Sequence, residues 1–331
     1  MVETQTQLIK NDELLNNVAC FVLLENSNER QPFFVCDLLG KPVFEWVTQA
    51  CPTIPVTIEC GSNDSVVEII RPYLKSAEFT LVLYGDTPLL SKLTINNILE
   101  YISREDINVC TLERGYVFRT DYIRRVEDIY GAVKYPYFSD EFKQMNSLEV
   151  LDQTRQMLKE RILNFHINNG VTILDKSLSY IEGDVGIAEG VVIEPYVRLG
   201  GQTQVFENVK ISSGANIVSS KIGANSNIGK AVIINSTIKE NCRIEDGANI
   251  SDGSFIGSSS IIGKNSIIEN SSIAPGGQIN MFSSVISAKI YPGAVVGSYS
   301  LVAGDKECPI RVAQNEIVEP YQIRRQTKEE K

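Results

Sequence analysis

The stretch IKENCRIEDGANISDGSFIGSSSIIGKNSII, residues 238–268, places an isoleucine at every sixth position and fills the intervals largely with Gly, Ser, Asn and Asp. A strict six-residue period is typical of hexapeptide repeats, in which each short strand turns one aliphatic side chain inward and small polar residues form the corners. The stretch therefore predicts a parallel β-helix, a stack in which each coil contacts only its neighbours. A disordered tract of similar composition would lack the periodic isoleucines.

The six-residue period extends over residues 187–302. Its register shifts at Ile222 and again at Ile238, and between these two shifts the period counts Ile234 among the inward-facing residues. With three six-residue strands in each coil, this run predicts about six and a half coils.

Composition limits the classes of function. The chain has 331 residues, which suggests about two domains, and its net charge of −10 argues against a nucleic-acid-binding surface. It begins without the apolar segment of a signal peptide and contains no run of eighteen apolar residues, so we expect no membrane span. The seven cysteines form no C-x-x-C pair. They indicate reduced thiols in a cytoplasmic protein rather than a zinc site or a disulfide framework.

The part of the chain before the repeats alternates between two patterns. Buried strands are predicted at residues 18–24, 54–59 and 79–84, and helices at residues 43–50, 64–74 and 93–103. This alternation predicts an α/β domain with a mostly parallel sheet and helices on both faces. A long helix then follows from Ser147 to Asn168, and Asn169-Gly170 is expected to end it.

Four motifs identify a resemblance. They are Leu-Gly-Lys-Pro at residues 39–42, Tyr-Gly-Asp-Thr-Pro-Leu-Leu at 84–90, Gly-Val-Thr-Ile-Leu-Asp at 170–175 and Tyr-Ile-Glu-Gly-Asp-Val at 180–185. In this order they resemble the GlmU family, the bacterial bifunctional UDP-N-acetylglucosamine pyrophosphorylases and glucosamine-1-phosphate acetyltransferases. The resemblance implies a Rossmann-like, nucleotidyltransferase-like α/β domain, a left-handed β-helix and a homotrimer assembled through the β-helix.

The resemblance and the patterns together predict five segments. A flexible N-terminal segment is followed by a reduced nucleotidyltransferase-like domain, a connecting helix, the β-helix and a C-terminal tail. Their bounds are 1–17, 18–146, 147–170, 171–305 and 306–331.

Several motifs of the family are missing. Nucleotidyl transfer needs backbone amides close to the phosphates, and the family supplies them from a Gly-x-Gly-Thr-Arg-Met loop. Residues 24–33 here read LENSNERQPF, without glycine, and Phe33 stands where the family has lysine. The family's sugar-binding Asn-Thr-Gly corresponds to Glu113-Arg114-Gly115. The resemblance still implies that a nucleotide or sugar phosphate would meet Arg30, Lys41, Gly85 and Asp86.

Asp86 and Asn146 are the candidate ligands for Mg²⁺. Asp86 follows a parallel strand, where ligands bind in open α/β sheets, and a carboxylate oxygen suits Mg²⁺. The resemblance implies Asn146 as its partner. A second interpretation stays open, in which Asp86 caps the turn before Pro88 and Asn146 caps the following helix.

The repeats offer little acetyltransferase chemistry. Hexapeptide acyltransferases generally use a histidine base, and the single histidine, His166, precedes the repeats and is expected to be a packing residue. The family's Asn-Tyr-Asp-Gly run does not occur. The leading hypothesis is therefore a degenerate GlmU-like protein that acts in binding or as an oligomeric scaffold. Two alternatives remain, an active Mg²⁺-dependent pyrophosphorylase and an acyltransferase with a glutamate base in the β-helix.

Overall fold

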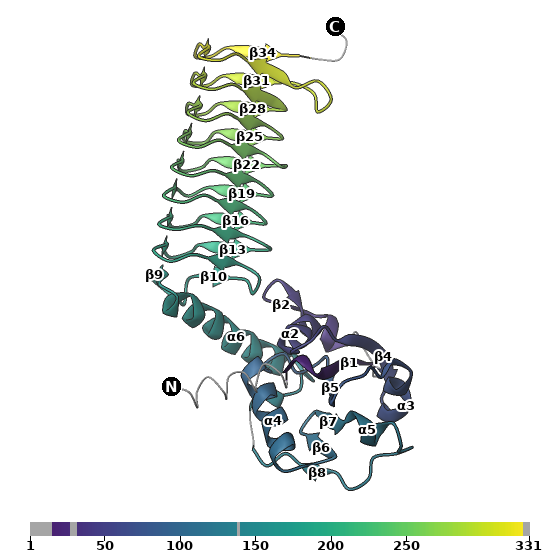
Figure 1. Cartoon of the computed structure of the whole chain (residues 1–331). Helices are drawn as coiled ribbons and strands as arrows, with labels where there is room; N and C mark the ends of the chain where they lie inside the picture. Colours follow the sequence, from purple (N-terminus) through teal and green to yellow (C-terminus); the bar gives the residue numbers. More distant parts are fainter. Residues whose placement is uncertain (1–14, 27–31, 138–139, 327–331) are drawn as a thin grey trace, which may run out of the picture. The chain divides into compact units, whose positions relative to one another are not determined.

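The computed structural model describes residues 15–26, 32–137 and 140–326 and divides into two compact units between Leu158 and Lys159 (Figure 1). The division lies inside helix α6 (Leu148–Asn168), whereas the change of period had placed it near residue 170. Of the predicted N-terminal segment, residues 1–14 lie outside the described part. Within the described ranges, no helix has both the length and the hydropathy needed to cross a bilayer.

The first unit is built around a mixed sheet with the strand order β4-β1-β5-β7-β6-β8. Strand β1 pairs in parallel with β4 and β5, and the β6–β8 pair is also parallel, whereas β7 runs antiparallel to β5 and β6. The α/β class predicted from the sequence is confirmed. The strands are β1 (Val18–Asn26), β4 (Val56–Gly61), β5 (Phe79–Tyr84), β6 (Val109–Leu112), β7 (Gly115–Arg119) and β8 (Val133–Lys134), with a separate hairpin of β2 (Asp37–Leu38) and β3 (Lys41–Pro42).

Helices cover both faces of this sheet because β1 is apolar on both sides. Val18, Cys20 and Val22 face a cluster that includes residues of α2 and α4, whereas Ala19 and Phe21 face residues of α3 and α5. This two-sided burial explains the continuous apolar run of β1. The helices are α2 (Val43–Ala50), α3 (Val66–Ile70), α4 (Lys92–Arg104) and α5 (Thr120–Ile123), with 3₁₀ turns η1 (Phe33–Val35), η2 (Arg71–Tyr73) and η3 (Asp140–Phe142).

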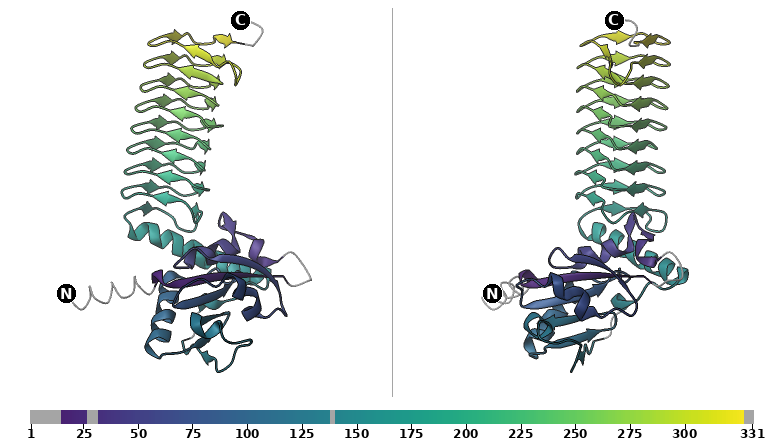
Figure 2. Two further views of the ribbon diagram at one scale, coloured as in Figure 1. Left: turned by 45° about the vertical axis from the view of Figure 1, so that its right-hand side comes forward. Right: turned by 90° about the vertical axis from the view of Figure 1, so that its right-hand side faces the viewer.

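The second unit is a parallel β-helix whose coils stack in register (Figure 2). Ile244, Ile262 and Ile279 show the pattern, since each pairs with the equivalent residue of the next coil and all are fully buried. The first sheet is β10 (Tyr180–Ile181), β13 (Arg198–Gly200), β16 (Asn216–Val218), β19 (Val232–Ile234), β22 (Asn249–Ser251), β25 (Ile267–Glu269), β28 (Ser284–Ile286), β31 (Leu301–Ala303) and β34 (Ile323–Arg325).

The other two faces of the β-helix follow the same rule. The second sheet is β11 (Gly186–Ile187), β14 (Gln204–Val205), β17 (Lys221–Ile222), β20 (Thr237–Ile238), β23 (Phe255–Ile256), β26 (Ser272–Ile273), β29 (Ala288–Ile290) and β32 (Ile310–Val312). The third sheet is β9 (Thr172–Ile173), β12 (Val192–Ile193), β15 (Lys210–Ile211), β18 (Asn227–Ile228), β21 (Arg243–Ile244), β24 (Ile261–Ile262), β27 (Gln278–Ile279), β30 (Val295–Val296) and β33 (Ile317–Val318).

The small polar residues at the corners are partly buried and hydrogen-bonded from coil to coil. The Ser271 amide donates to the Ser254 hydroxyl (3.2 Å), and the Ala288 amide donates to the Ser271 hydroxyl (3.0 Å). Each hydroxyl also donates to a corner carbonyl, as Ser271 does to Glu269 (2.7 Å). A hydroxyl that both donates and accepts satisfies backbone groups that an aliphatic side chain would leave unpaired.

Two predictions about the β-helix were wrong. Its sheets contain nine, eight and nine strands, more than six and a half coils would give. A longer corner at residues 304–309 interrupts the period, so the strands from Ile310 to Arg325 had been assigned to the tail. The register also fails at Ile234, because the corner before it is one residue short. Ile233 is fully buried, and Ile234 is 40% exposed.

The inward series ends in a charged residue. Arg324 pairs with Val302 of the preceding coil and so holds the position that an aliphatic side chain holds in earlier coils. Its guanidinium forms an ion pair with Glu316, whose other oxygen accepts from the Ala313 amide (2.6 Å). The hydrogen bond from Arg324, with that amide, lowers the pKa of Glu316. The last described coil therefore closes the apolar core with an ion pair.

Candidate functional site

The crevice at the carboxyl ends of β1 and β5 is the place where this kind of sheet binds ligands, because connections leave β1 toward opposite sides. Leu23 of β1 pairs with Tyr84 of β5, so Glu25 and Asp86, each two residues further along, lie side by side. Two adjacent carboxylates repel each other unless a cation lies between them. The structure therefore has to supply a positive charge at this edge.

Arg114, from the turn between β6 and β7, supplies that charge. Its Nε donates to Asp86 Oδ1 (3.3 Å) and its Nη2 to Asp86 Oδ2 (2.9 Å), a bidentate pairing. Nη2 also forms an ion pair with Glu25. The guanidinium lies 3.9 Å from the ring centroid of Tyr84. The side chains of Asp86, Arg114 and Glu25 are 13%, 20% and 21% exposed, so this ion triad is largely buried.

Gly115 allows the hairpin to bring Arg114 over the strand ends. Its φ of +141° is rarely adopted by residues with a side chain, and a Cβ there would lie 2.6 Å from the carbonyl oxygen of Val82. A glycine is therefore required where β7 starts beside β5. The position of Arg114 depends on this close approach.

The electrostatics agree with a permanently charged guanidinium. Burial disfavours the charged form, but hydrogen bonds and charges from Asp86 and Glu25 outweigh burial and raise the pKa of Arg114. Burial, with the neighbouring Tyr116, raises the pKa of Tyr84 to about 12. The Tyr84 ring is therefore neutral and presents its π face to the guanidinium.

The second oxygen of Asp86 is also engaged. Gln144 Nε2 donates to Asp86 Oδ2 (2.9 Å), and the Met145 amide donates to the Asp86 carbonyl (2.8 Å). Asn146, the predicted second metal ligand, is the next residue and is exposed. It does not cap α6, because the Ser147 hydroxyl accepts from the Val150 amide (3.2 Å) in that role. The Asp86 oxygens are bound by side chains of the protein, so this carboxylate does not fit a resident Mg²⁺ in this arrangement.

The other predicted binding residues have structural surroundings. A Cβ on Gly85 would lie 2.6 Å from a methyl carbon of Leu24, so glycine is needed there for packing. Lys41 is 4% exposed, and its ammonium lies 4.0 Å from the Trp46 ring centroid and is hydrogen-bonded to Gln49. Arg30 lies outside the described residues.

A neighbouring concavity continues the same edge of the sheet. It has a volume of about 470 Å³ and is lined by Asn26, Glu59, Cys60 and Asp64, with the turn of residues 61–63. Burial raises the pKa of Cys60, and the nearby Glu25 and Asp64 raise it further. The wall is acidic, and an acidic wall repels phosphate groups.

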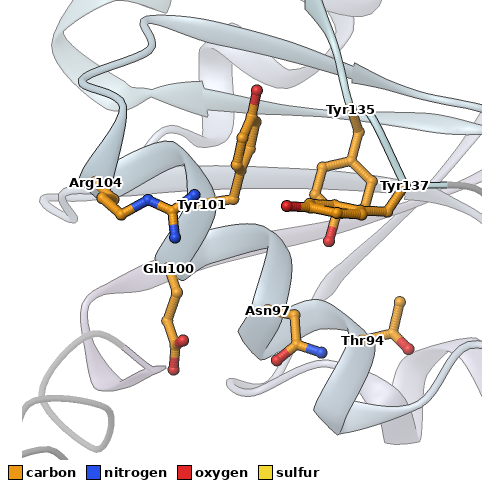
Figure 3. Close-up of a pocket in the computed structure, with 7 residues that line it drawn as sticks. All are labelled: Thr94, Asn97, Glu100, Tyr101, Arg104, Tyr135 and Tyr137. Atoms are coloured by element: carbon orange, nitrogen blue, oxygen red, sulfur yellow. The ribbon is translucent and has the colours of Figure 1, made fainter.

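A second cavity, of about 480 Å³, lies beside α4 and the segment after β8 (Figure 3). Tyr101, Tyr135 and Tyr137 pack edge to face with ring centroids 5.4–6.2 Å apart. The rings fill one another's space, and side chains of α4, namely Thr94, Asn97, Glu100 and Arg104, complete the lining. None of the site residues predicted from the sequence lines this cavity.

His166 lies in α6 and is 3% exposed. Its Nδ1 has no hydrogen-bond partner among the described residues. Burial lowers its pKa, so the neutral imidazole is favoured. In the second unit it is a buried aromatic residue in contact with Phe165 (centroids 5.4 Å apart).

Sequence reasoning missed Arg114 as a site residue. The motif around it was noted only as a departure from a sugar-binding motif, and its partners lie 28 and 89 residues away in the chain. The available signal was an arginine before a glycine in a short turn between two strands. That signal does not say which carboxylates the arginine meets.

Comparisons with known proteins follow the division into two units. No protein-family model matches the chain. Among curated proteins, the bifunctional protein GlmU of Caldanaerobacter subterraneus subsp. tengcongensis is 23% identical over 307 residues, covering 66% of this chain and 67% of that protein. GlmU of Thermotoga petrophila is 26% identical and covers 59% of this chain and 56% of that protein.

Shorter matches are more similar. GlmU of Lactobacillus johnsonii is 33% identical over 118 residues, which is 35% of this chain and 25% of that protein. The matched region of the relatives ranges from 20% to 67% of their length. Among solved structures, a CMP:2-keto-3-deoxy-manno-octonic acid synthetase in complex with CTP covers 46% of this chain and 87% of its own at 13% identity, but its TM-score of 0.27 supports no conclusion. The sequence comparisons show that the chain resembles the bifunctional GlmU proteins.

Proposed function

We propose that the chain is a GlmU-like protein of UDP-N-acetylglucosamine metabolism whose α/β unit has lost uridylyl transfer and acts in binding. Its β-helix would serve as a scaffold for a cytoplasmic homotrimer. The observation that carries the proposal is the pairing of Arg114 with Asp86 and Glu25. The resemblance to GlmU supplies the chemistry that this pairing would replace.

The pairing opposes catalysis for an electrostatic reason. Nucleotidyl transfer relies on divalent cations that bridge phosphate oxygens, and on a protein cation beside them. Arg114 offers a single charge, and Asp86 and Glu25 already accept its donors. Loss of one preorganised electrostatic contact typically costs about 10²–10³ in rate, and such losses act on one unit rather than independently.

The same geometry limits nucleotide binding. A phosphate could reach Arg114 only by replacing the carboxylates that hold it, and the neighbouring wall carries Glu59 and Asp64. Affinity for a nucleotide or a sugar phosphate is therefore expected to be weak and to require Arg114 to leave Asp86. Binding of Mg²⁺ is expected only together with that release.

The test is release of pyrophosphate from UTP and N-acetylglucosamine 1-phosphate with Mg²⁺, measured for the wild type beside Asp86→Ala. Equal background rates in both proteins support the proposal. A rate in the wild type that disappears in the variant overturns it and favours the active pyrophosphorylase. Calorimetric titration of both proteins with UTP separates weak binding from turnover.

The oligomer part of the proposal rests on one face of the β-helix. Outward positions of the sheet from β10 to β34 include Val232, Ile234, Ile267 and Ile323, each at least 36% exposed. Burial of such side chains between copies removes apolar surface from water. Light scattering should give a trimer for the wild type. A monomer at micromolar concentration contradicts this part of the proposal.

The acyltransferase alternative gains no support from Glu182, the buried glutamate of the β-helix. Its oxygens accept from Arg198 (2.9 Å) and from the Gly201 amide (2.7 Å). A carboxylate held by two donors is a poor proton acceptor, because these bonds stabilise its charged form. An acetyl-CoA hydrolysis or transfer assay on the same preparation tests this alternative directly.

A further inference from the structure

Two of the seven cysteines face each other inside the α/β unit. Cys20 lies in the middle of β1, and Cys51 is the C-cap residue of α2. They belong to the same apolar cluster and are 3% and 6% exposed. Their side chains are hydrogen-bonded to each other. All seven cysteines are free thiols in the structure.

The surroundings divide the two thiols into different roles. Cys20 Sγ accepts a hydrogen bond from the Thr53 hydroxyl (3.3 Å) in addition to the one from Cys51. These hydrogen bonds, led by that from Cys51, lower the pKa of the Cys20 thiol despite its burial. The same contact, with burial, raises the pKa of Cys51, whose thiol also reaches the Val47 carbonyl (3.5 Å). Cys20 is the thiol more easily ionised, and Cys51 keeps its proton.

A cavity gives access to this end of β1. It has a volume of about 310 Å³, and its lining includes Cys20, Thr53 and Lys75. A small reagent can therefore approach Cys20 without passing through the rest of the core. Cys110 lacks such a partner, and burial alone raises the pKa of this thiol to about 11.

We propose that Cys20 and Cys51 form a reversible dithiol–disulfide pair that low-molecular-weight disulfides oxidise. The Cys20 thiolate attacks one sulfur of the small disulfide and expels the other half as a thiolate. The Cys51 sulfur then loses its proton, attacks Cys20 Sγ and expels the second half. Two S–H bonds are replaced by one S–S bond, and the small disulfide takes up two electrons and two protons to become two thiols.

The product would join the central strand to the end of α2. The intervening segment includes η1 and the β2–β3 hairpin, so the bond closes a loop that is otherwise held by packing alone. Closing such a loop restricts the unfolded chain and stabilises the folded one. This role is independent of Asp86 and Arg114, and it holds whether or not the α/β unit is an enzyme.

The experiment treats the folded full chain with glutathione disulfide, quenches with acid, unfolds the protein and alkylates the remaining thiols. We expect five of the seven thiols to be alkylated in the oxidised wild type, against seven after reduction. Cleavage after glutamate separates the cysteines, since residues 14–25 then contain only Cys20 and residues 46–59 only Cys51. Mass spectrometry should find these two peptides linked.

Matched variants keep the result interpretable. Cys110→Ser should still lose two thiols, whereas Cys51→Ser should give no internal link and at most a glutathione adduct on Cys20. Oxidation of the wild type in guanidinium chloride should scramble the pairing, because the selectivity comes from the fold. Seven alkylated thiols after treatment of the folded wild type, or a link to Cys36 or Cys60 in place of Cys51, overturns the proposal.

Discussion

The β-helix and the ion triad of the α/β unit depend on contacts of very different range. In the β-helix, Ile250 meets Ile233 of the preceding coil and Ile268 of the following one, so its surroundings repeat from coil to coil. In the α/β unit, Arg114 meets Glu25 across 89 residues, and no second group repeats that contact. Repetition spreads stability over many equivalent positions. The triad concentrates charge compensation in one side chain.

Ile250→Asn is expected to have the largest effect. The amide would be buried without a partner, and loss of apolar burial adds to this cost, for a total of about 3–6 kcal/mol. The free energy of unfolding of the β-helix, followed by circular dichroism in denaturant, measures it. The matched control is Ile234→Asn, at an exposed outward position, where we expect less than about 1 kcal/mol. Equal losses in the two variants would contradict the observed register.

Arg114→Met removes the cation and leaves two adjacent carboxylates. Breaking a fully buried pair costs about 3–5 kcal/mol, and since this triad is partly exposed we expect about 2–4 kcal/mol. The freed carboxylates should also gain affinity for Mn²⁺, measured by electron paramagnetic resonance. Arg155→Met, which breaks an exposed pair with Asp152, is the control and should cost less than about 1 kcal/mol.

The Mn²⁺ signal of Arg114→Met should disappear again in Arg114→Met/Asp86→Asn. An unchanged stability together with no Mn²⁺ binding would show that Arg114 does not replace a cation. The contrast between a redundant β-helix and a single decisive side chain would then fail.

Gly115→Ala tests the approach that positions Arg114. The variant combines an unfavourable φ with a contact at 2.6 Å, for which we expect a loss of about 2–3 kcal/mol. Gly131→Ala separates the two causes, because Gly131 also has a positive φ (+62°) but nothing lies within 4 Å of an added Cβ. We expect about 1 kcal/mol there. Equal losses in thermal denaturation would assign the whole effect to φ.

His166→Gln should have the smallest effect and should depend on pH. Burial lowers the pKa of His166, so the unfolded chain binds a proton that the folded chain rejects. The histidine contribution to stability is therefore complete above the ordinary histidine pKa and is lost as the pH falls below it, with a slope of at most about 1.4 kcal/mol per pH unit. His166 is the only histidine, so the difference between wild type and variant isolates it. A flat difference between pH 7.5 and 5.5 would contradict this.

The same difference in range explains what the sequence could predict. The six-residue period identified the β-helix because each coil states its own rule within eighteen residues or so. It failed at Ile234, where one missing corner residue shifted the count, and after residue 303, where a longer corner hid the final strands. Both errors are local, because the period gives no information about corner length.

The candidate site was predicted only in outline. Asp86 was correctly placed at the end of a strand, since that depends on the buried run of β5. That Arg114 and Gln144 would bind it could not be predicted, because both contacts depend on how distant segments cross the sheet edge. The burial of Lys41 against Trp46 likewise depends on the β2–β3 hairpin folding over α2.

The ion pair of Arg324 and Glu316 has a consequence for growth of the protein beyond one chain. A stack of identical coils has no natural length, and a bare apolar end with unpaired strands can act as a template on which further chains polymerise. Any coil added beyond β34 would have to bury Arg324 and Glu316, and burying charges is costly. The pair therefore acts as a terminator written into the last coil. Replacing Arg324 by isoleucine would remove this barrier, so that filament formation becomes limited by nucleation rather than forbidden at the end of the chain.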